Sequence, residues 1–436
     1  MRRFAIAALL LTACATTPPP QTAKPIEQPR ISRSPNALTA VASAPRVIAE
    51  PKIRVGMLSD QSTVVFPRTS DGYALVTGKG PSTLKRGFTA SAPLANATVR
   101  YAVQMSAISD QTSANALAEK LRGETGLRVD VTFDPASGTH KVLAGDFESS
   151  DAATPVRAQL TDRGYGRDLL VVRRPSDQPF PKRIEIVDDE GDRAILEGDS
   201  VLILPLSADT VVIDKQPYRG GARLFVNPRG LLNVINELPF EEYLYGVVPA
   251  EMPASWPAEA LAAQAVCARS YALTSRSTGL PWDVFADVRS QVYRGVLSEV
   301  PASTAAVRAT RGKVVTVGGQ VAQTFFFSTS GGRTAANEEG FGGSPISYLR
   351  SVDDPYDNES PVHTWTARFT RGEADRKLGS LVTGRLRGLE VATRSPSGRA
   401  ATVLVRGSGG DRTVSAASVR TALGLRSTWL ERISGP

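Results

Sequence analysis

Short runs of alternating apolar and polar residues, bounded by turn residues, predict β-strands in two regions of the chain. The first region covers residues 47–98, and the second begins at residue 183. The predicted strands lie at residues 53–58, 63–66, 73–76, 183–187, 201–206, 211–213, 222–227 and 231–237. We interpret both regions as parts of one β-rich body that is interrupted by the segment between them.

The interrupting segment, residues 99–174, has a compact pattern of its own. Its predicted elements are a strand at 99–105, a helix at 111–123, strands at 127–133 and 141–147, a helix at 151–163 and a strand at 169–172. This βαββαβ order is typical of the ferredoxin-like unit, a fold with many functions. We expect it to occupy a surface loop of the body, because closing a loop whose ends lie together costs little free energy.

An alanine-rich stretch, residues 258–273, predicts a helix behind Pro257, whose missing N–H suits a first helical turn. Its apolar residues recur at helical spacing, at Leu261, Ala265, Ala268 and Ala272. We expect this helix to be buried, so the long side chains of Gln264 and Arg269 must reach a cleft or bond to internal carbonyl groups. The predicted fold class is α+β and multi-domain: a β-rich lobe with buried alanine-rich helices, interrupted by the smaller unit.

The first residues have the pattern of an export signal. Arg2 and Arg3 precede a short apolar run, residues 4–11, which is too short to span a bilayer. The run ends in Leu11-Thr12-Ala13-Cys14, which resembles a bacterial lipobox and predicts a lipoprotein signal peptide at 1–13 with Cys14 lipidated. An ordinary signal peptide with an incidental cysteine is the alternative. The Pro/Thr-rich residues 14–46 predict a flexible tether.

The composition of the chain argues against several kinds of partner and catalytic site. The 51 Lys and Arg against 43 Asp and Glu give a net charge of +8, but no basic arm or aromatic-basic stripe is present, so we expect no nucleic-acid partner. Two cysteines and two histidines are too few for a multi-thiolate or multi-imidazole zinc site, and we predict no metal and no other cofactor. With Cys14 lost to lipid, Cys267 has no disulfide partner, and we expect it to be a buried thiol rather than a nucleophile.

One carboxylate stands out. Glu251 lies between Pro249 and Pro253, which fix their own φ angles and restrict the residue before each. A rigid, apolar surrounding favours the protonated form of a glutamate, which is the condition for a general acid at neutral pH. The residues alone leave a catalytic and a structural carboxylate both open.

Two stretches resemble known families. The first matches the SPOR domain, which binds peptidoglycan glycan strands that have lost their stem peptides, through Tyr101–Met105, Ser113–Leu117, Gly126–Leu127 and Val142–Phe147. The second, from residue 183 to the end, resembles the SpoIID/LytB family through Val247–Leu273, Asp287–Gly295, Ala309–Val315, Phe325–Thr334, Tyr348–Tyr356, Gly407–Gly410, Thr413–Ser415 and Leu423–Trp429. Both resemblances imply that the chain acts on the same polymer, peptidoglycan glycan strands without stem peptides.

The SpoIID/LytB resemblance implies a lytic transglycosylase that cleaves denuded glycan strands and leaves 1,6-anhydro ends. Its catalytic glutamate falls on Glu251. This residue protonates the glycosidic oxygen, and it or the sugar's N-acetyl group then assists attack by the 6-hydroxyl group. The resemblance also implies glycan positioning by Gln264, Arg269, Thr329, Ser330 and Tyr348, each with a structural role as the alternative.

Some members of the family bind zinc through Cys and His in the segment that matches residues 283–293. This chain has Asp287, Arg289 and Ser290 there, which supports the prediction of no zinc. His363 is expected to be a surface or loop-packing residue. The alternative function is a non-catalytic glycan-binding protein or a modulator of a cell-wall amidase.

The resemblances predict an exported protein held in the cell envelope by lipid at Cys14. Ala15 supplies no acidic inner-membrane retention signal, so we expect the periplasmic face of the outer membrane in a diderm host. The predicted partners are denuded glycan strands and the membrane, with a cell-wall amidase under the alternative function.

Overall fold

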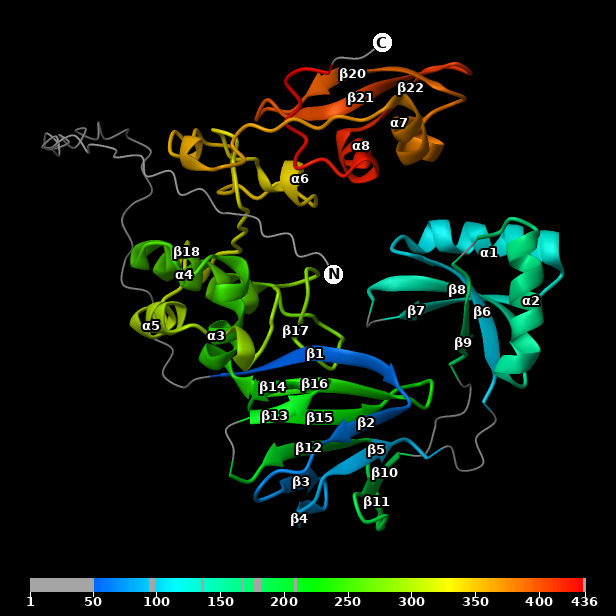
Figure 1. Cartoon of the computed structure of the whole chain (residues 1–436), viewed down its shortest axis with the longest axis vertical. Coiled ribbons are helices and arrows are strands. Elements are labelled where there is room, and N and C mark those ends of the chain that lie inside the picture. Colours follow the sequence, from blue (N-terminus) through cyan, green and yellow to red (C-terminus); the bar gives the residue numbers. More distant parts are fainter. Residues whose placement is uncertain are drawn as a thin grey trace, which may run out of the picture. The chain divides into compact units, whose positions relative to one another are not determined.

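The computed structural model describes residues 51–93, 99–134, 137–166, 168–175, 182–207 and 210–433 (Figure 1). The predicted signal peptide, Cys14 and the tether lie outside these residues. Within them, helices and several separate sheets occur in more than one part of the chain, which confirms the α+β, multi-domain fold class. None of the described helices has the length and apolar character needed to cross a membrane.

The largest sheet joins strands from both sides of the interrupting segment. Its order is β17-β1-β16-β15-β12-β3-β4. The strands are β1 (Lys52–Gln61), β3 (Tyr73–Thr77), β4 (Gly80–Leu84), β12 (Ser200–Pro205), β15 (Gly221–Val226), β16 (Leu232–Pro239) and β17 (Val284–Phe285). In the antiparallel pair β1–β16, Ile53 lies opposite Leu238. Residues far apart in the sequence therefore share one sheet.

A second sheet has the order β11-β10-β5-β2, made of β2 (Thr63–Phe66), β5 (Phe88–Ser91), β10 (Arg183–Asp188) and β11 (Arg193–Glu197). Strands β5 and β10 are antiparallel neighbours, with Ser91 opposite Glu185. The whole segment 92–182 thus connects the two strands of a β-hairpin. A small hairpin, β13 (Thr210–Ile213) and β14 (Gln216–Arg219), completes this part.

Both sheets contribute to one core. The period-two alternation of β10 is visible in its burial, since Ile184 and Ile186 are buried while their neighbours are only partly covered. The ring of Phe66 from β2 stacks on that of Phe88 from β5 with centroids 4.9 Å apart. These four side chains belong to the same buried cluster as those of β1, β3 and β16.

The segment 99–174 forms a four-stranded antiparallel sheet with two helices. Its elements are β6 (Tyr101–Ile108), α1 (Gln111–Thr125), β7 (Val129–Asp134), β8 (Thr139–Phe147), α2 (Ser150–Asp162) and β9 (Leu170–Arg173). The sheet order β7-β8-β6-β9 is compatible with the ferredoxin-like prediction. The side chains of Asp110 and Ser149 cap the two helices by accepting backbone N–H bonds.

Three helices follow the large sheet: α3 (Phe240–Glu251), which continues directly from β16, α4 (Ala258–Thr274) and α5 (Pro301–Ala309). The apolar stripe predicted for α4 is buried, with Leu261 at 1 % exposure and Ala265, Ala268 and Ala272 at 0 %. These side chains belong to the same core as the sheets. The short 3-10 helix η1 (Val296–Ser298) leads into α5.

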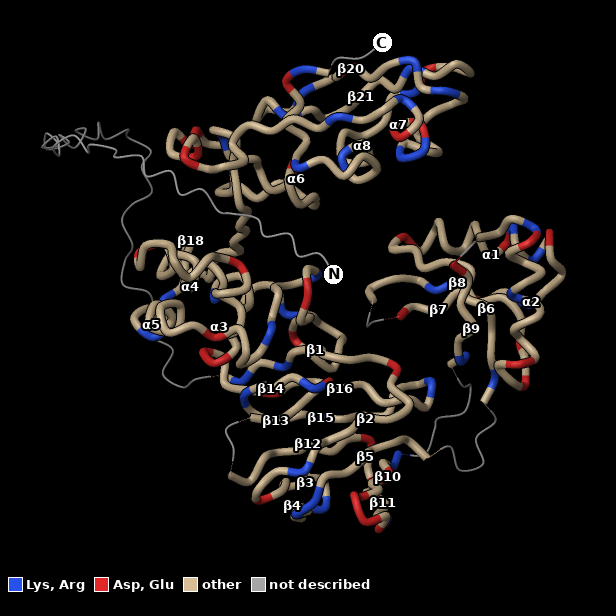
Figure 2. Tube along the Cα trace, in the orientation of Figure 1, with Lys and Arg blue, Asp and Glu red and all other residues tan. Residues whose placement is uncertain are grey.

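The C-terminal residues have a hydrophobic core of their own, which includes Leu378, Val403, Val405 and Val419. This cluster is separate from the one that contains the two sheets, and a single domain over residues 183–436 stays a prediction. The short hairpin of β18 (Thr316–Val317) and β19 (Gln320–Val321) lies against α4 (Figure 1). The elements that follow this hairpin are α6 (Asn337–Gly340), η2 (Asp357–Glu359), α7 (Arg371–Leu378), η3 (Gly379–Leu381), β20 (Leu386–Arg394), β21 (Ala400–Gly407), β22 (Arg412–Ser415) and α8 (Ala416–Leu423). Figure 2 shows basic and acidic residues interspersed along the described chain.

Candidate functional site

Glu251 is the last residue of α3. The backbone of Met252 is already extended, and its N–H donates to the carbonyl of Val248 at 3.0 Å. Pro249 lies in the last turn of α3, and Pro253 follows the helix, where it cannot continue the helical hydrogen bonds. The two prolines therefore border the helix end that presents the Glu251 side chain.

A loop from a distant part of the chain holds the Glu251 carboxylate. The Val292 N–H donates to Oε1 of Glu251 at 2.9 Å, and no other hydrogen bond from a described residue reaches the Glu251 carboxylate. The partly buried Glu251 thus has one carboxylate oxygen held by a backbone group, and its other oxygen accepts no hydrogen bond from a described residue. A carboxylate with one oxygen fixed and one available suits proton transfer at a set angle.

The loop that contains Val292 is ordered by its own polar groups. The Arg289 guanidinium binds both carboxylate oxygens of Asp287 and stacks over the Phe285 ring, 3.9 Å from its centroid. Ser290 Oγ accepts from the N–H of Phe285 at 3.1 Å. These contacts hold the loop in the conformation that presents the Val292 amide.

Two tyrosines lie within electrostatic range of Glu251. Burial, and then the negative charge of Glu251, raises the pKa of Tyr271 on α4; Tyr243 on α3 has its pKa raised by burial, by Tyr271 and by Glu251. Both hydroxyl groups are therefore protonated at neutral pH. The Tyr243 hydroxyl donates to Oε1 of Gln291 at 3.3 Å, next to Val292. Sequence reasoning missed Tyr243 and Gln291, because nothing in their spacing links them to Glu251.

Gln264 lies on α4 with 7 % of its surface exposed. Its Nε2 is buried and has no hydrogen-bond partner among the described residues. A buried amide without a partner is costly, so this atom is a donor that a water molecule or a ligand oxygen can satisfy. The prediction that Gln264 positions glycan stays open.

Arg269 occupies a different environment from the one the resemblance implied. It is 2 % exposed, and its Nε and Nη2 donate to the two carboxylate oxygens of Glu241 at 2.9 and 2.7 Å. Its Nη1 donates to the carbonyl of Lys313 at 2.9 Å. This arrangement favours the structural alternative for Arg269, because its donors are already used inside the protein.

Thr329 and Ser330 lie in a loop that is organised by Asp357. The backbone N–H groups of Ser330 and Gly331 donate to the two oxygens of Asp357 at 2.7 and 2.9 Å, and His363 Nδ1 is 2.7 Å from Oδ2. Thr329 Oγ1 is 2.7 Å from the hydroxyl oxygen of Ser360. No hydrogen bond among the described residues joins this cluster to Glu251, so a shared role of Thr329, Ser330 and Glu251 stays a prediction.

The hydrogen bonds that Asp357 accepts from Ser330, Gly331 and His363 should make the stability of this loop depend on pH. Burial alone would raise the pKa of Asp357, but the hydrogen bonds from His363, Ser330 and Gly331 together lower it below its ordinary 3.8. A carboxyl group with a lowered folded-state pKa stabilises the fold above its unfolded pKa, and this stabilisation is lost as the pH falls through the folded value. We expect amide protection at residues 329–332 to be constant from neutral pH down to about 4 and to fall below that.

Hydrogen exchange read by mass spectrometry, corrected for intrinsic rates, measures this protection. Asp357→Asn should remove the acid-dependent step, whereas the exposed control Asp411→Asn should keep it. An unchanged step in Asp357→Asn would contradict the assignment.

Tyr348 is partly buried, and its hydroxyl accepts from the N–H of Gln323 at 3.0 Å. The next residue, Thr324, donates to the carbonyl of Cys267 on α4 at 2.8 Å. The Tyr348 hydroxyl is therefore tied to the segment that binds α4. Cys267 itself is partly buried, and burial raises the pKa of its thiol, as expected for an unreactive cysteine.

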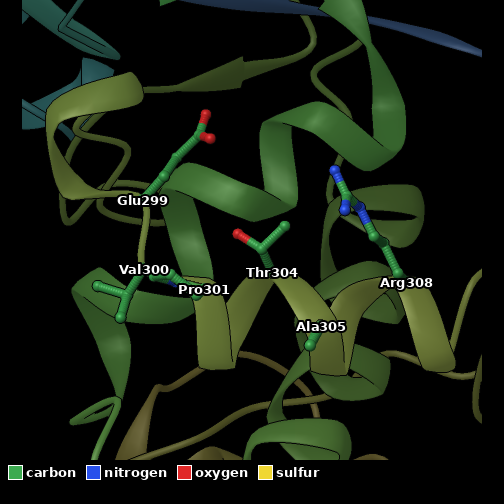
Figure 3. A pocket seen from close by; sticks show the side chains of 6 residues that line it. All are labelled: Glu299, Val300, Pro301, Thr304, Ala305 and Arg308. Atoms are coloured by element: carbon green, nitrogen blue, oxygen red, sulfur yellow. The ribbon is translucent and has the colours of Figure 1, made fainter.

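A surface pocket along α5 carries no comparable chemistry. Figure 3 shows its lining, which consists of Glu299, Val300, Pro301, Thr304, Ala305 and Arg308. Its two charged residues are engaged elsewhere: Glu299 accepts two bonds from Arg219, and Arg308 lies over the Tyr245 ring. None of the predicted site residues lines it.

The segment 283–293 does not offer a metal-binding set. Asp283 accepts from the backbone and the guanidinium of Arg54, and Asp287 is bound by Arg289. Among the described residues, no group of three or more His, Cys, Asp and Glu side chains is arranged to hold a metal ion. That the chain binds no zinc stays a prediction, tested by chelation below.

Comparison with known proteins gives two family matches. Residues 229–317 match the family described as stage II sporulation protein, and residues 97–171 match the SPOR domain. The chain is 32 % identical over 248 residues to stage II sporulation protein D of Bacillus subtilis, which covers 52 % of this chain and 71 % of that protein. It is 29 % identical over 272 residues to the protein of the same name from Bacillus amyloliquefaciens, covering 54 % and 78 % of the two chains.

Two further similarities cover shorter stretches. A Bacillus subtilis protein named amidase enhancer is 39 % identical over 134 residues, which are 31 % of this chain and 18 % of that protein. A solved peptidoglycan-binding domain of a Bacillus subtilis cell wall lytic enzyme is 26 % identical, with a TM-score of 0.16, and the match covers 18 % of this chain and 94 % of that one.

Proposed function

Because the chain belongs to the stage II sporulation protein D family and contains a SPOR domain, we propose that this cell-wall protein is a lytic transglycosylase acting on denuded peptidoglycan glycan strands. The observation that carries the proposal is the Glu251 carboxylate, which is held at one oxygen by the Val292 amide and has no hydrogen bond from a described residue at the other. A general acid needs this combination of fixed position and access.

The proposed reaction needs one carboxyl group. Protonated Glu251 gives its proton to the glycosidic oxygen as the bond from that oxygen to the anomeric carbon breaks. The 6-hydroxyl oxygen of the same sugar then bonds to the anomeric carbon, and its proton returns to Glu251. The products are a free 4-hydroxyl end and a 1,6-anhydro end, with no water consumed.

The test is digestion of amidase-stripped glycan strands by the full chain in oxygen-18 water. We expect fragments with 1,6-anhydro ends that carry no heavy oxygen. Fragments with a reducing end and incorporated oxygen-18 would identify a hydrolase and contradict the proposal.

A second function is favoured by one comparison, the similarity to the protein named amidase enhancer. Under this reading the chain binds glycan strands and stimulates a cell-wall amidase without cutting. Uncut strands together with faster release of stem peptides by added amidase would establish it.

We also expect chelation to leave strand cleavage unchanged. The carboxylates of segment 283–293 are bound by arginines, so removal of divalent metal has no ligand set there to disturb. Cleavage rates measured before and after dialysis against EDTA test this. Loss of activity that returns with added zinc would show that a metal site exists.

We further propose that Cys14 anchors the protein by lipid on the periplasmic face of the outer membrane in a diderm host. The lipobox-like Leu11–Cys14 supports the anchor, and Ala15 supports the choice of membrane. The SPOR domain would hold the protein at strands already stripped of peptides, which raises the local concentration of substrate at Glu251.

A further inference from the structure

Trp256 is an exposed aromatic side chain on the turn that follows Glu251. It is 48 % exposed, whereas Trp282 is 3 % exposed in the same part of the chain. A large apolar ring at the surface is unremarkable by itself. It follows the proposed catalytic Glu251 closely in the chain, which gives the exposure a purpose.

The turn that carries Trp256 is rigid. The Trp256 N–H donates to the carbonyl of Pro253 at 3.0 Å, which closes a β-turn over residues 253–256. Pro257 follows, and its carbonyl accepts from the N–H groups of Ala260 and Leu261 in the first turn of α4. The backbone of Trp256 is therefore fixed between a proline-bounded turn and a helix start.

The distance from Trp256 to Glu251 has an upper limit. A β-turn keeps its end Cα atoms within about 7 Å, and two trans peptide steps add about 3.8 Å each, so the Cα atoms of Glu251 and Trp256 lie within about 15 Å. A few consecutive sugar units of one glycan strand span such a distance. The limit thus places Trp256 within a few sugars of the bond at Glu251.

The second loop at Glu251 also carries an exposed apolar residue. Val288 is 88 % exposed on the loop whose Val292 amide binds Glu251. Its neighbours Asp287 and Arg289 form an ion pair, so their charges balance each other on this loop. Each loop that meets Glu251 therefore presents an apolar side chain to solvent.

We propose that Trp256, with Val288 as a secondary contact, forms a subsite that stacks on the pyranose ring of an N-acetylated sugar within a few units of the cleaved bond. The C–H groups on one face of a pyranose carry partial positive charge and suit the negative face of the indole. Stacking fixes the strand without a charge, which matches a strand that has lost its acidic peptides. This subsite rests on the proposed function and specifies its substrate contact.

The test separates binding from cleavage. The full-length Glu251→Gln variant, labelled with 5-fluorotryptophan, gives one fluorine signal for each of the four tryptophans, and loss of a signal in Trp256→Phe assigns Trp256. Amidase-stripped strands should shift the Trp256 signal and leave the buried Trp282 signal in place. An unmoved Trp256 signal in protein saturated with strands overturns the subsite.

The second measurement is of KM and kcat for cleavage of stripped strands, with the unsubstituted protein as the parent. In the parent background, Trp256→Ala should raise KM for stripped strands about tenfold with kcat nearly unchanged, and Trp256→Phe should restore most of the loss. Val65→Ala, at a 62 % exposed apolar residue on β2 of the second sheet, should match the parent. An unchanged KM, or a fall in kcat alone, contradicts stacking.

Failure of the proposed function has a different signature. If the parent does not cut strands but the Trp256 signal still shifts, the transglycosylase proposal is wrong and the subsite stands. If the parent cuts and the signal does not move, the subsite is wrong and the proposed function stands.

Discussion

Replacing Glu251 with Gln should reduce cleavage of stripped glycan strands by at least about a hundredfold, because general acid–base catalysis contributes about 10²- to 10⁴-fold. The glutamine keeps the size of the side chain and an oxygen that can accept the Val292 N–H bond. It cannot give a proton to the glycosidic oxygen. We therefore expect the variant to bind strands with unchanged affinity and to release almost no 1,6-anhydro product by mass spectrometry.

A matched control is available on the next helix. Glu259 is an exposed glutamate in the first turn of α4, and Glu259→Gln makes the same chemical change away from the Val292 bond. This control should cleave strands at the parent rate. Equal activity of Glu251→Gln and the parent would remove Glu251 from the mechanism, and equal loss in both variants would point to a general effect of glutamate substitution.

Removing either partner of the Arg269–Glu241 pair should destabilise the body by about 3–5 kcal/mol, because the remaining charge is left buried without its partner. The side chains are 2 % and 8 % exposed, so solvent cannot replace the lost bonds. Native-state hydrogen exchange of α3 and α4 peptides in Arg269→Ala measures the local opening free energy, and it does so even where other parts of the chain unfold separately.

Two comparisons distinguish this effect from a loss of packing. The double variant Arg269→Met with Glu241→Leu should recover most of the stability, because it removes both charges and keeps apolar volume. The surface variant Arg406→Ala breaks exposed pairs with Glu390 and Asp411 and should change stability by less than about 1 kcal/mol. Stability of Arg269→Ala within that range would contradict the structural role.

The helices and strands could be predicted from the sequence more fully than the contacts between residues far apart in the chain. The stripe of Leu261, Ala265, Ala268 and Ala272 repeats with the helical period, and burial of α4 follows from that repeat alone. The βαββαβ order could likewise be derived, because each element has its own local period. The separate hydrophobic cluster of the C-terminal residues could not be derived from the sequence, since a run of strands does not show which of them share a core.

The site depends on pairings that local patterns do not encode. Arg269 and Glu241 are 28 residues apart, and an acidic residue in the first turn of a helix is ordinarily an exposed one. The Val292 contact to Glu251 uses a backbone N–H, which every non-proline residue has. A side-chain pattern could therefore single out Glu251 but could not identify the group that holds it.

The pairing of β5 with β10 has a consequence for how such a chain is assembled from parts. Because Ser91 and Glu185 face each other across two antiparallel strands, everything between them is formally the loop of a hairpin. A short turn in its place would preserve the register of both sheets. The SPOR-containing segment can therefore be deleted, or replaced by another domain that binds the cell wall, without a change in the strands of the two sheets.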